Sequence, residues 1–458
     1  MPATLTNYDA ERLRRLDRAH HLHPFSNNRV VVEEGGGPIY TRADGVYIWD
    51  TDNKRYLDGM AGLWCVNIGY GRQELVEAAA RQMQELPYYS SFFNSTTPPT
   101  VELANKLTEL ADGKLERALF ANSGSEANDT AVWLIRRYWD LMGRPAKKTF
   151  IARRNAYHGS TMMAASLGNW GKMHEQGGLP LPGVVHVRQP YWFGESEGMA
   201  PDEFGKLCAR AIEDKIKEIG ADKVAAVIGE PVQGAGGVII PPASYWPEVQ
   251  RICRQYDVLL VADEVICGFG RTGRWFGHQT LGFEPDVMTG AKGLSSGYMP
   301  ISTVMMSAKI AKTLVESGDW HHGFTYSGHP VAAAVALKNI ELMEREDLVD
   351  KVRTETGPYF AQRLKTLEDH PLVGEVRTCG LLGAIELVAD RGSRARYEPP
   401  GNAGTICRGH SFANGLIMRA CVDTMVLSPP LILTRAQVDE LVASARKALD
   451  ATAKELKA

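Results

Sequence analysis

The chain has 458 residues, which at the usual size of about 100–200 residues per domain predicts two to three domains. Hydrophobic residues make up 44% of it and charged residues 23%, close to the average of globular proteins, which excludes collagenous, disordered and coiled-coil classes. Lys and Arg (51) nearly balance Asp and Glu (54), so the net charge of −3 provides no basic surface for nucleic acid or an anionic membrane, and we expect a small-molecule ligand.

From the distribution of apolar and charged residues we expect neither a targeting signal nor a membrane-spanning segment. The N-terminal segment 1–21 mixes Asp, Glu and Arg with no apolar stretch, and no later run approaches the ~18 apolar residues of a membrane helix. The seven cysteines are scattered without a C-x-x-C pair, which argues against a disulfide framework and against a zinc site. We therefore expect a cytoplasmic protein without a metal site.

The predicted elements change character along the chain. Segment 38–59 alternates apolar and polar residues around two turn sequences, as antiparallel hairpins do. From about residue 115 to 305, short apolar runs alternate with helices predicted over 126–142, 203–219 and 245–256. The apolar runs are ALFANS, KTFIARR, GVVHVRQ, VAAVIGEP, VLLVADEV and DVMTGAK.

This alternation predicts an α/β fold with a mostly parallel central sheet that helices cover on both faces. After a further helix over 331–346, the C-terminal segment mixes helical and strand patterns. We therefore predict a large domain over 63–335 and a smaller α+β domain built from both chain ends, 1–62 and 336–458.

Ligands of an open α/β sheet bind beyond the carboxyl ends of its strands, so the polar residues there are the candidate site residues. Asp263 ends the run VLLVA, where a buried carboxylate needs a cationic partner, although a helix cap or an internal ion pair would also explain it. Lys292 follows the next run among Gly, Ala and Ser residues, which leave room for a ligand. Burial there would lower its pKa, as covalent catalysis by an amine requires. Glu230 closes VAAVIG, either as a site residue or as part of a structural ion pair.

Two further predicted strand ends carry candidate site residues. Gly124 and Ser125 lie between a predicted strand and a long helix, where free N–H groups and the helix dipole bind phosphate; a simple serine N-cap is the alternative. Tyr157 follows KTFIARR and offers an aromatic face. Segment 268–273 matches G-x-G-x-x-G, but it neither directly follows a strand nor leads into a helix, so we do not expect a dinucleotide site.

A phosphate cradle, an aromatic face, a buried carboxylate and a lysine among small residues together describe a pyridoxal 5′-phosphate site. Their order resembles the class III aminotransferases of fold type I, with LLVADEVICGFGRTGRWFGHQTLGFEPDVMTGAKGLSSG as the carboxylate and lysine signature. Within that family the chain is most similar to the ω-amine:pyruvate aminotransferases of the putrescine/diamine group. This likeness runs nearly end to end, through HLHPF, GLWCVNIGYG, SGSEANDT, YHGST, EPVQGAGGVIIPP, HGFTYSGHPVAAAVAL and LIMRACVDTMVLSPPL.

The resemblance implies transfer of the amino group from a primary amine or diamine to pyruvate, giving an aldehyde or ketone and L-alanine. It implies that Lys292 holds the cofactor covalently and moves protons, and that Asp263 pairs with the ring nitrogen. The implied catalytic residues are Lys292, Asp263 and Tyr157, and the implied cofactor contacts are Gly124, Ser125, Tyr157, Glu230, Asp263, Val265, Lys292 and, from a second subunit, Thr325. Shared active sites imply a homodimer or homotetramer.

The resemblance also implies a substrate pocket of Phe25, Trp64, Phe92 and Tyr157, with Arg419 binding the carboxylate of pyruvate. The chain departs from the family pattern after Arg419, because Val422 stands where glycine is common. Three alternatives remain: a taurine-, β-alanine- or GABA-type aminotransferase, a mutase or racemase of the same fold, and a pyridoxal-phosphate-binding protein without catalysis.

Overall fold

The computed structural model of the protein describes residues 8–457. The first seven residues of the segment that we expected to carry no targeting signal lie outside this range. Among the described helices, none combines the length and the apolar character that crossing a lipid bilayer requires.

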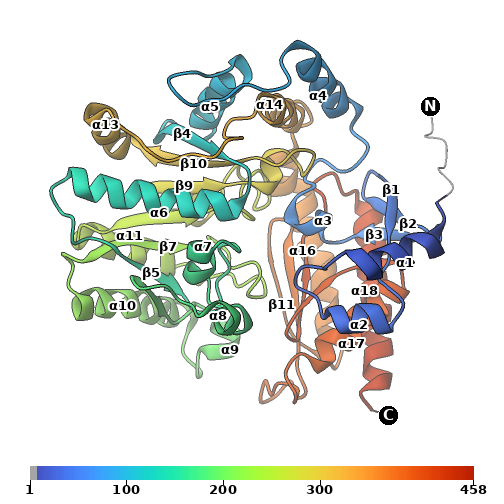
Figure 1. Cartoon of the computed structure of the whole chain (residues 1–458). Coiled ribbons are helices and arrows are strands. Elements are labelled where there is room, and N and C mark those ends of the chain that lie inside the picture. Colours follow the sequence, from blue (N-terminus) through green and yellow to red (C-terminus); the bar gives the residue numbers. More distant parts are fainter. Residues whose placement is uncertain (1–7, 458) are drawn as a thin grey trace.

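A seven-stranded sheet forms the core of the larger part of the molecule, at the left in Figure 1. Its strands are β4 (Leu115–Ala121), β5 (Thr149–Arg153), β6 (Val184–Val187), β7 (Val224–Gly229), β8 (Leu259–Asp263), β9 (Val287–Gly290) and β10 (Ser302–Ser307). They are ordered β4-β10-β9-β8-β7-β5-β6, and the run from β9 to β6 is parallel throughout. The predicted α/β fold with a mostly parallel sheet is confirmed, and each predicted apolar run overlaps one strand.

Strand β10 is the element of this sheet that the sequence pattern did not predict. It lies between β4 and β9 and runs antiparallel to both, with Met305 opposite Ala118 on one side and Met288 on the other. Antiparallel neighbours need no crossover helix. The prediction relied on strands that alternate with helices, and it therefore missed β10, which follows β9 without an α-helix between them.

Helices cover both faces of the sheet because successive residues of a strand point to opposite sides. In β8, Val261 packs toward one helical layer, whereas Leu260 and Ala262 pack toward the other, and all three are buried. The first layer contains α6 (Gly124–Leu141), α7 (Met162–Leu167) and α13 (Ala308–Ser317), and the second contains α10 (Pro201–Ile219) and α11 (Tyr245–Gln255). The three helices predicted in this region are confirmed.

The two chain ends share a sheet, in which β13 (Leu416–Ile417) pairs in parallel with β3 (Arg55–Asp58). Figure 1 shows these blue and red segments side by side, next to the large sheet. The predicted N-terminal hairpins are confirmed as β1 (Tyr40–Asp44), β2 (Tyr47–Asp50) and β3, which pair antiparallel in sequence order. The other elements of this region are β11 (Val373–Cys379), β12 (Leu382–Leu387), β14 (Arg419–Cys421), β15 (Thr424–Leu427), α16 (Gly357–Lys365), α17 (Asn402–Ala413) and α18 (Arg435–Glu455).

Helix α14 (Pro330–Arg345) confirms the helix predicted over 331–346 and joins the two regions, because its buried face shares one apolar core with α18. The predicted domain boundary at 335/336 falls inside this helix, and the boundaries at 62/63 and 335/336 stay predictions. The remaining helices are α1 (Ala10–His20), α2 (Asn28–Glu33), α3 (Ala61–Trp64), α4 (Gln73–Glu85), α5 (Pro98–Leu110), α8 (Gly171–Gly177), α9 (Trp192–Glu195), α12 (Gly277–Leu281) and α15 (Leu348–Lys351).

Candidate active site

Asp263 is the last residue of β8 and is almost fully buried. One carboxylate oxygen accepts hydrogen bonds from the side chains of His158 (Nδ1, 2.7 Å) and Asn128 (Nδ2, 2.8 Å), and the other accepts one from the backbone of Val265 (3.0 Å). Three donors directed at one carboxylate hold it in a fixed orientation at the end of the strand. Neither His158 nor Asn128 was predicted as a site residue; His158 stood in the YHGST segment, where only the tyrosine was considered.

Lys292 holds a backbone conformation that residues other than glycine rarely adopt, with φ at +48°. Such strain collects at functional sites. Burial lowers the pKa of Lys292, and the positive charge of Arg419 lowers it further. The carboxylates of Asp263 and Glu230 act in the opposite direction without cancelling the effect. The amine is therefore neutral more often than that of an ordinary lysine, so a larger fraction of it can act as a nucleophile or accept a proton.

Tyr157 is fixed by Glu230, the residue that follows β7. The buried carboxylate of Glu230 accepts hydrogen bonds from the backbone N–H groups of Tyr157 (3.3 Å) and Gly234 (2.8 Å). Burial raises the pKa of Glu230. These contacts give Glu230 a positioning role for the tyrosine loop, while its direct contact with the cofactor stays a prediction.

The N-terminus of α6 offers the predicted anion site. Ser123 is the N-cap and accepts a hydrogen bond from the backbone of Glu126, whereas within residues 8–457 the N–H groups of Gly124 and Ser125 donate none. The serine that caps the helix is thus a different one from the serine predicted to bind phosphate. A Cβ atom at Gly124 would lie 3.0 Å from both methyl carbons of Val265, so only glycine lets the backbone approach this closely.

Aromatic rings gather around Lys292 and Arg419. The Lys292 amine lies 5.6 Å from the centre of the Trp64 ring, and the Arg419 guanidinium lies 5.4 Å from the Trp64 ring and 5.5 Å from the Trp170 ring. Trp170 was not predicted, and its ring also lies against Tyr157 (5.5 Å) and Phe25 (5.9 Å between ring centroids). Trp64 is buried with φ at +60°, so it is a second residue beside Lys292 with a strained backbone.

Phe92 and Thr325 lie in a different cluster from the other predicted residues. The Thr325 carbonyl accepts a hydrogen bond from the hydroxyl of Tyr88 (2.6 Å), and a Cβ atom at Gly323 would lie 2.9 Å from the Phe92 ring. Thr325 is exposed. The contacts of the described chain do not join either residue to Lys292, so their place at an active site stays a prediction that needs a second chain.

The hairpin that carries Arg419 contains Val422, at the position where the resemblance implies glycine. Val422 forms the turn between β14 and β15 with φ at +57°, in the left-handed region that glycine enters without strain. The carboxylate of Asp423 fixes the turn by accepting hydrogen bonds from the N–H groups of Gly401 (2.8 Å) and Gly404 (2.9 Å). The hydrogen bonds of Asp423 therefore hold the turn in place, although the backbone of Val422 is strained.

Replacing Val422 with asparagine should stabilise the protein by about 1 kcal/mol, because asparagine adopts the left-handed region more readily than a β-branched residue. A rise in the thermal midpoint would show it. Val101→Asn is the matched control: this valine is also exposed but lies in α5, where the two residues have similar helix propensity. A lower midpoint for Val422→Asn than for Val101→Asn would contradict the argument.

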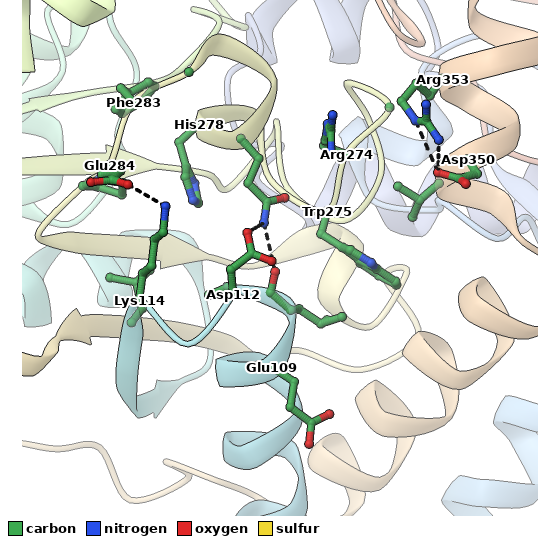
Figure 2. Close-up of a pocket in the computed structure, with 18 of the residues that line it drawn as sticks. Glu109, Asp112, Lys114, Arg274, Trp275, His278, Phe283, Glu284, Asp350 and Arg353 are labelled. Atoms are coloured by element: carbon green, nitrogen blue, oxygen red, sulfur yellow. Dashed lines mark hydrogen bonds and ion pairs between the residues drawn. The ribbon is translucent and has the colours of Figure 1, made fainter.

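A large pocket of about 1020 Å³ lies away from these residues (Figure 2). Part of its lining lies at or just before the start of strands, such as Leu115 at the start of β4 and Pro285 before β9, so the pocket opens at the amino ends of these strands. Much of its charge is paired internally, since Lys114 and Arg254 both bind Glu284. None of the predicted site residues lines it.

The residues around Lys292 fit pyridoxal 5′-phosphate. The free N–H groups at the start of an 18-residue helix suit a phosphate, and the buried Asp263 carboxylate suits a protonated ring nitrogen. Tyr157, whose ring could stack on the cofactor, directly precedes His158, which hydrogen-bonds to Asp263. Lys292, with its lowered pKa, stands at the neighbouring strand end.

Comparison with known proteins agrees with this assignment. Residues 32–449 match the family model of aminotransferase class-III. Putrescine–pyruvate aminotransferase of Pseudomonas aeruginosa is 52% identical over 453 residues, which cover 99% of each chain. The mitochondrial gamma aminobutyrate transaminase 1 of Solanum lycopersicum is 42% identical over 91% of this chain and 82% of its own.

Solved structures show the same likeness. The ω-transaminase of Pseudomonas jessenii in complex with PMP superposes with a TM-score of 0.94 at 43% identity and covers 97% of this chain and 99% of its own. An (S)-enantioselective ω-transaminase of Thermomicrobium roseum gives the same four values. The chain therefore belongs to the class-III aminotransferase family, and its cofactor is pyridoxal 5′-phosphate.

Proposed function

We propose that the protein is an ω-transaminase that transfers the amino group of a primary amine or diamine to pyruvate, giving an aldehyde or ketone and L-alanine. The names of the P. aeruginosa relative and of the two solved ω-transaminases support this substrate class. The observation that carries the proposal is the Arg419 guanidinium, which stands between Trp64 and Trp170 beside Lys292.

A pocket of aromatic rings with one guanidinium suits both substrates. Arg419 makes no ion pair within the described part of the chain, so its planar donors are available to the carboxylate of pyruvate, which they match as a bidentate pair. An amine donor without a carboxylate would instead meet the faces of Trp64 and Tyr157, which attract an ammonium group and cover an alkyl or aryl chain.

When bound, pyridoxal 5′-phosphate carries the amino group between the two half-reactions and withdraws electrons from the reacting carbon. The Lys292 amine, with its lowered pKa, would take and return the proton at that carbon. The Asp263 carboxylate, which three donors hold in place, would keep the ring nitrogen protonated. The N–H groups of Gly124 and Ser125 would bind the phosphate.

A panel of amine donors with pyruvate as the fixed acceptor tests this proposal. The panel should contain putrescine, an arylalkyl monoamine, GABA, β-alanine and taurine, with alanine formation as the measurement. We expect the highest kcat/KM for putrescine or the monoamine. The second candidate is a GABA-type enzyme, which the 42% identity to a gamma aminobutyrate transaminase favours. A clear preference for one of the three ω-amino acids would replace the first proposal by this one.

We also propose that the protein works as a homodimer or as a tetramer of such dimers. Four aromatic side chains near Phe92 and on neighbouring elements are more than half exposed: Tyr89 (57%), Phe93 (92%), Trp133 (57%) and Tyr326 (59%). Large exposed apolar side chains gathered in this way mark association surfaces. A second copy on this surface would bring Phe92 and Thr325 to its neighbour's pocket.

If Thr325 acts on the neighbouring site, mixed dimers should recover activity that neither parent has. Lys292→Ala removes the reactive amine, and Thr325→Asp places a negative charge where phosphate would bind. A hybrid of the two variants then has one site with an intact Lys292 and an intact Thr325. Alanine formation after subunit exchange is the measurement, with each variant exchanged against itself as the control. Failure to recover activity in verified hybrids would show that Thr325 does not serve the partner's site.

A further inference from the structure

The end of α1 brings together three side chains that the mechanism does not use. The Asp17 carboxylate holds one imidazole on each oxygen: Nδ1 of His21 lies 2.9 Å from Oδ1, and Nε2 of His23 lies 2.9 Å from Oδ2. One ligand atom from each of the three residues lies within 4.8 Å of the others. No arginine or lysine pairs with Asp17 among the residues that the structure describes, although Arg14 and Arg18 lie on the same helix.

The local fold holds this arrangement in place before any ligand binds. Asp17 and His21 are four residues apart and therefore lie on one face at the helix end. Asn28 fixes His23 from both sides, since its side chain accepts a hydrogen bond from the His23 N–H (2.8 Å) and donates one to the His23 carbonyl (3.0 Å).

We propose that Asp17, His21 and His23 form a binding site for a divalent first-row transition-metal ion such as Zn²⁺. Two imidazole nitrogens and one carboxylate oxygen are a ligand set that Zn²⁺, Co²⁺ and Ni²⁺ accept. A tetrahedral ion with its ligand atoms about 2.1 Å away holds them about 3.4 Å apart, so each Asp17–histidine distance of 2.9 Å would widen by about 0.5 Å when Zn²⁺ enters. Binding requires the proton on each facing nitrogen to move to the other nitrogen of the same ring or to water.

The proposed metal site lies close in the chain to Phe25, whose ring packs near the aromatic residues of the candidate active site. Phe25 follows His23 by two residues, has φ at +51°, and places its ring 6.2 Å from Tyr157 and 5.9 Å from Trp170. Its side chain is otherwise 66% exposed. A metal ion that ties the end of α1 to His23 would fix the segment that places Phe25 over the aromatic pocket. The cysteine spacing predicted no metal site, and this one uses other ligands.

Isothermal titration of the tag-free holoenzyme with ZnCl₂ in a non-chelating buffer tests the site, and the absorption spectrum of Co²⁺ reports its ligands. We expect one ion per chain. His21→Ala and Asp17→Asn should each weaken binding at least about tenfold, since even changes outside the ligand shell cost that much. The His21 side chain is 61% exposed, so its removal should leave the fold unchanged.

His20→Ala is the matched control, because this neighbouring histidine is exposed and lies outside the cluster. It should bind Zn²⁺ as the unmodified protein does. Hydrogen exchange over residues 18–26 should slow when Zn²⁺ binds, except in His21→Ala. Absence of binding, equal binding in His21→Ala and Asp17→Asn, or an equal loss in His20→Ala would overturn the proposed site. Unchanged exchange despite binding would overturn the link to Phe25.

Discussion

Replacing Lys292 with alanine should abolish turnover and leave the fold intact. The side chain lies at the end of the parallel strands in a strained backbone position, and alanine also fits the small-residue surroundings. The change removes both the covalent attachment point and the group that moves the proton. A positioned acid–base group alone contributes about 10²–10⁴-fold, so activity should fall at least that far. Alanine formation from putrescine and pyruvate, with circular dichroism as the check of folding, measures both expectations.

Borohydride reduction followed by peptide mass spectrometry identifies the lysine that holds the cofactor. The chain provides a control, because Lys147 is also buried and burial lowers its pKa. Its amine donates hydrogen bonds to the carbonyls of Val224 and Asp257 and is not free to react. We expect the label on the Lys292 peptide and none on Lys147. A label elsewhere, or full activity of Lys292→Ala, would refute the assignment.

Replacing Arg419 with alanine should weaken the two half-reactions unequally. The pyruvate half-reaction should lose roughly 2–5 kcal/mol, the cost of removing one partner of a desolvated charge pair. The half-reaction with a monoamine should change little, because that substrate has no carboxylate for the guanidinium to bind. The two tryptophans that flank Arg419 do not replace it, since an indole donates one hydrogen bond and carries no positive charge.

Single-turnover measurements of each half-reaction, followed by cofactor absorbance, separate these effects. Arg419→Lys is the matched control: it keeps the charge but not the bidentate geometry, and it should fall between the unmodified protein and Arg419→Ala for pyruvate. Equal losses in both half-reactions would show that Arg419 shapes the pocket without selecting the carboxylate. An unchanged pyruvate half-reaction would show that another group binds it.

The sequence by itself determined six of the seven strands of the large sheet and the residues at their ends. Asp263 and Lys292 could be recognised because a buried strand is a local apolar run, and parallel strands place the residues that follow them at one edge. The Gly124 junction is equally local, since a strand, a short turn and a helix follow one another directly. The family resemblance then predicted Trp64 and Arg419. In the chain, Trp64 precedes the first strand of this sheet and Arg419 follows the last one.

Only the tertiary structure decided which side chains meet. The partners of Asp263, the place of Trp170 against Arg419, and the antiparallel insertion of β10 all join segments far apart in the chain, and no local periodicity records such pairings. The Asp17, His21 and His23 cluster lies within seven residues, yet it also depends on the turn after α1, which directs His23 back toward the helix. Local patterns determine where a strand or helix ends. The packing between elements determines which side chains at those ends come into contact.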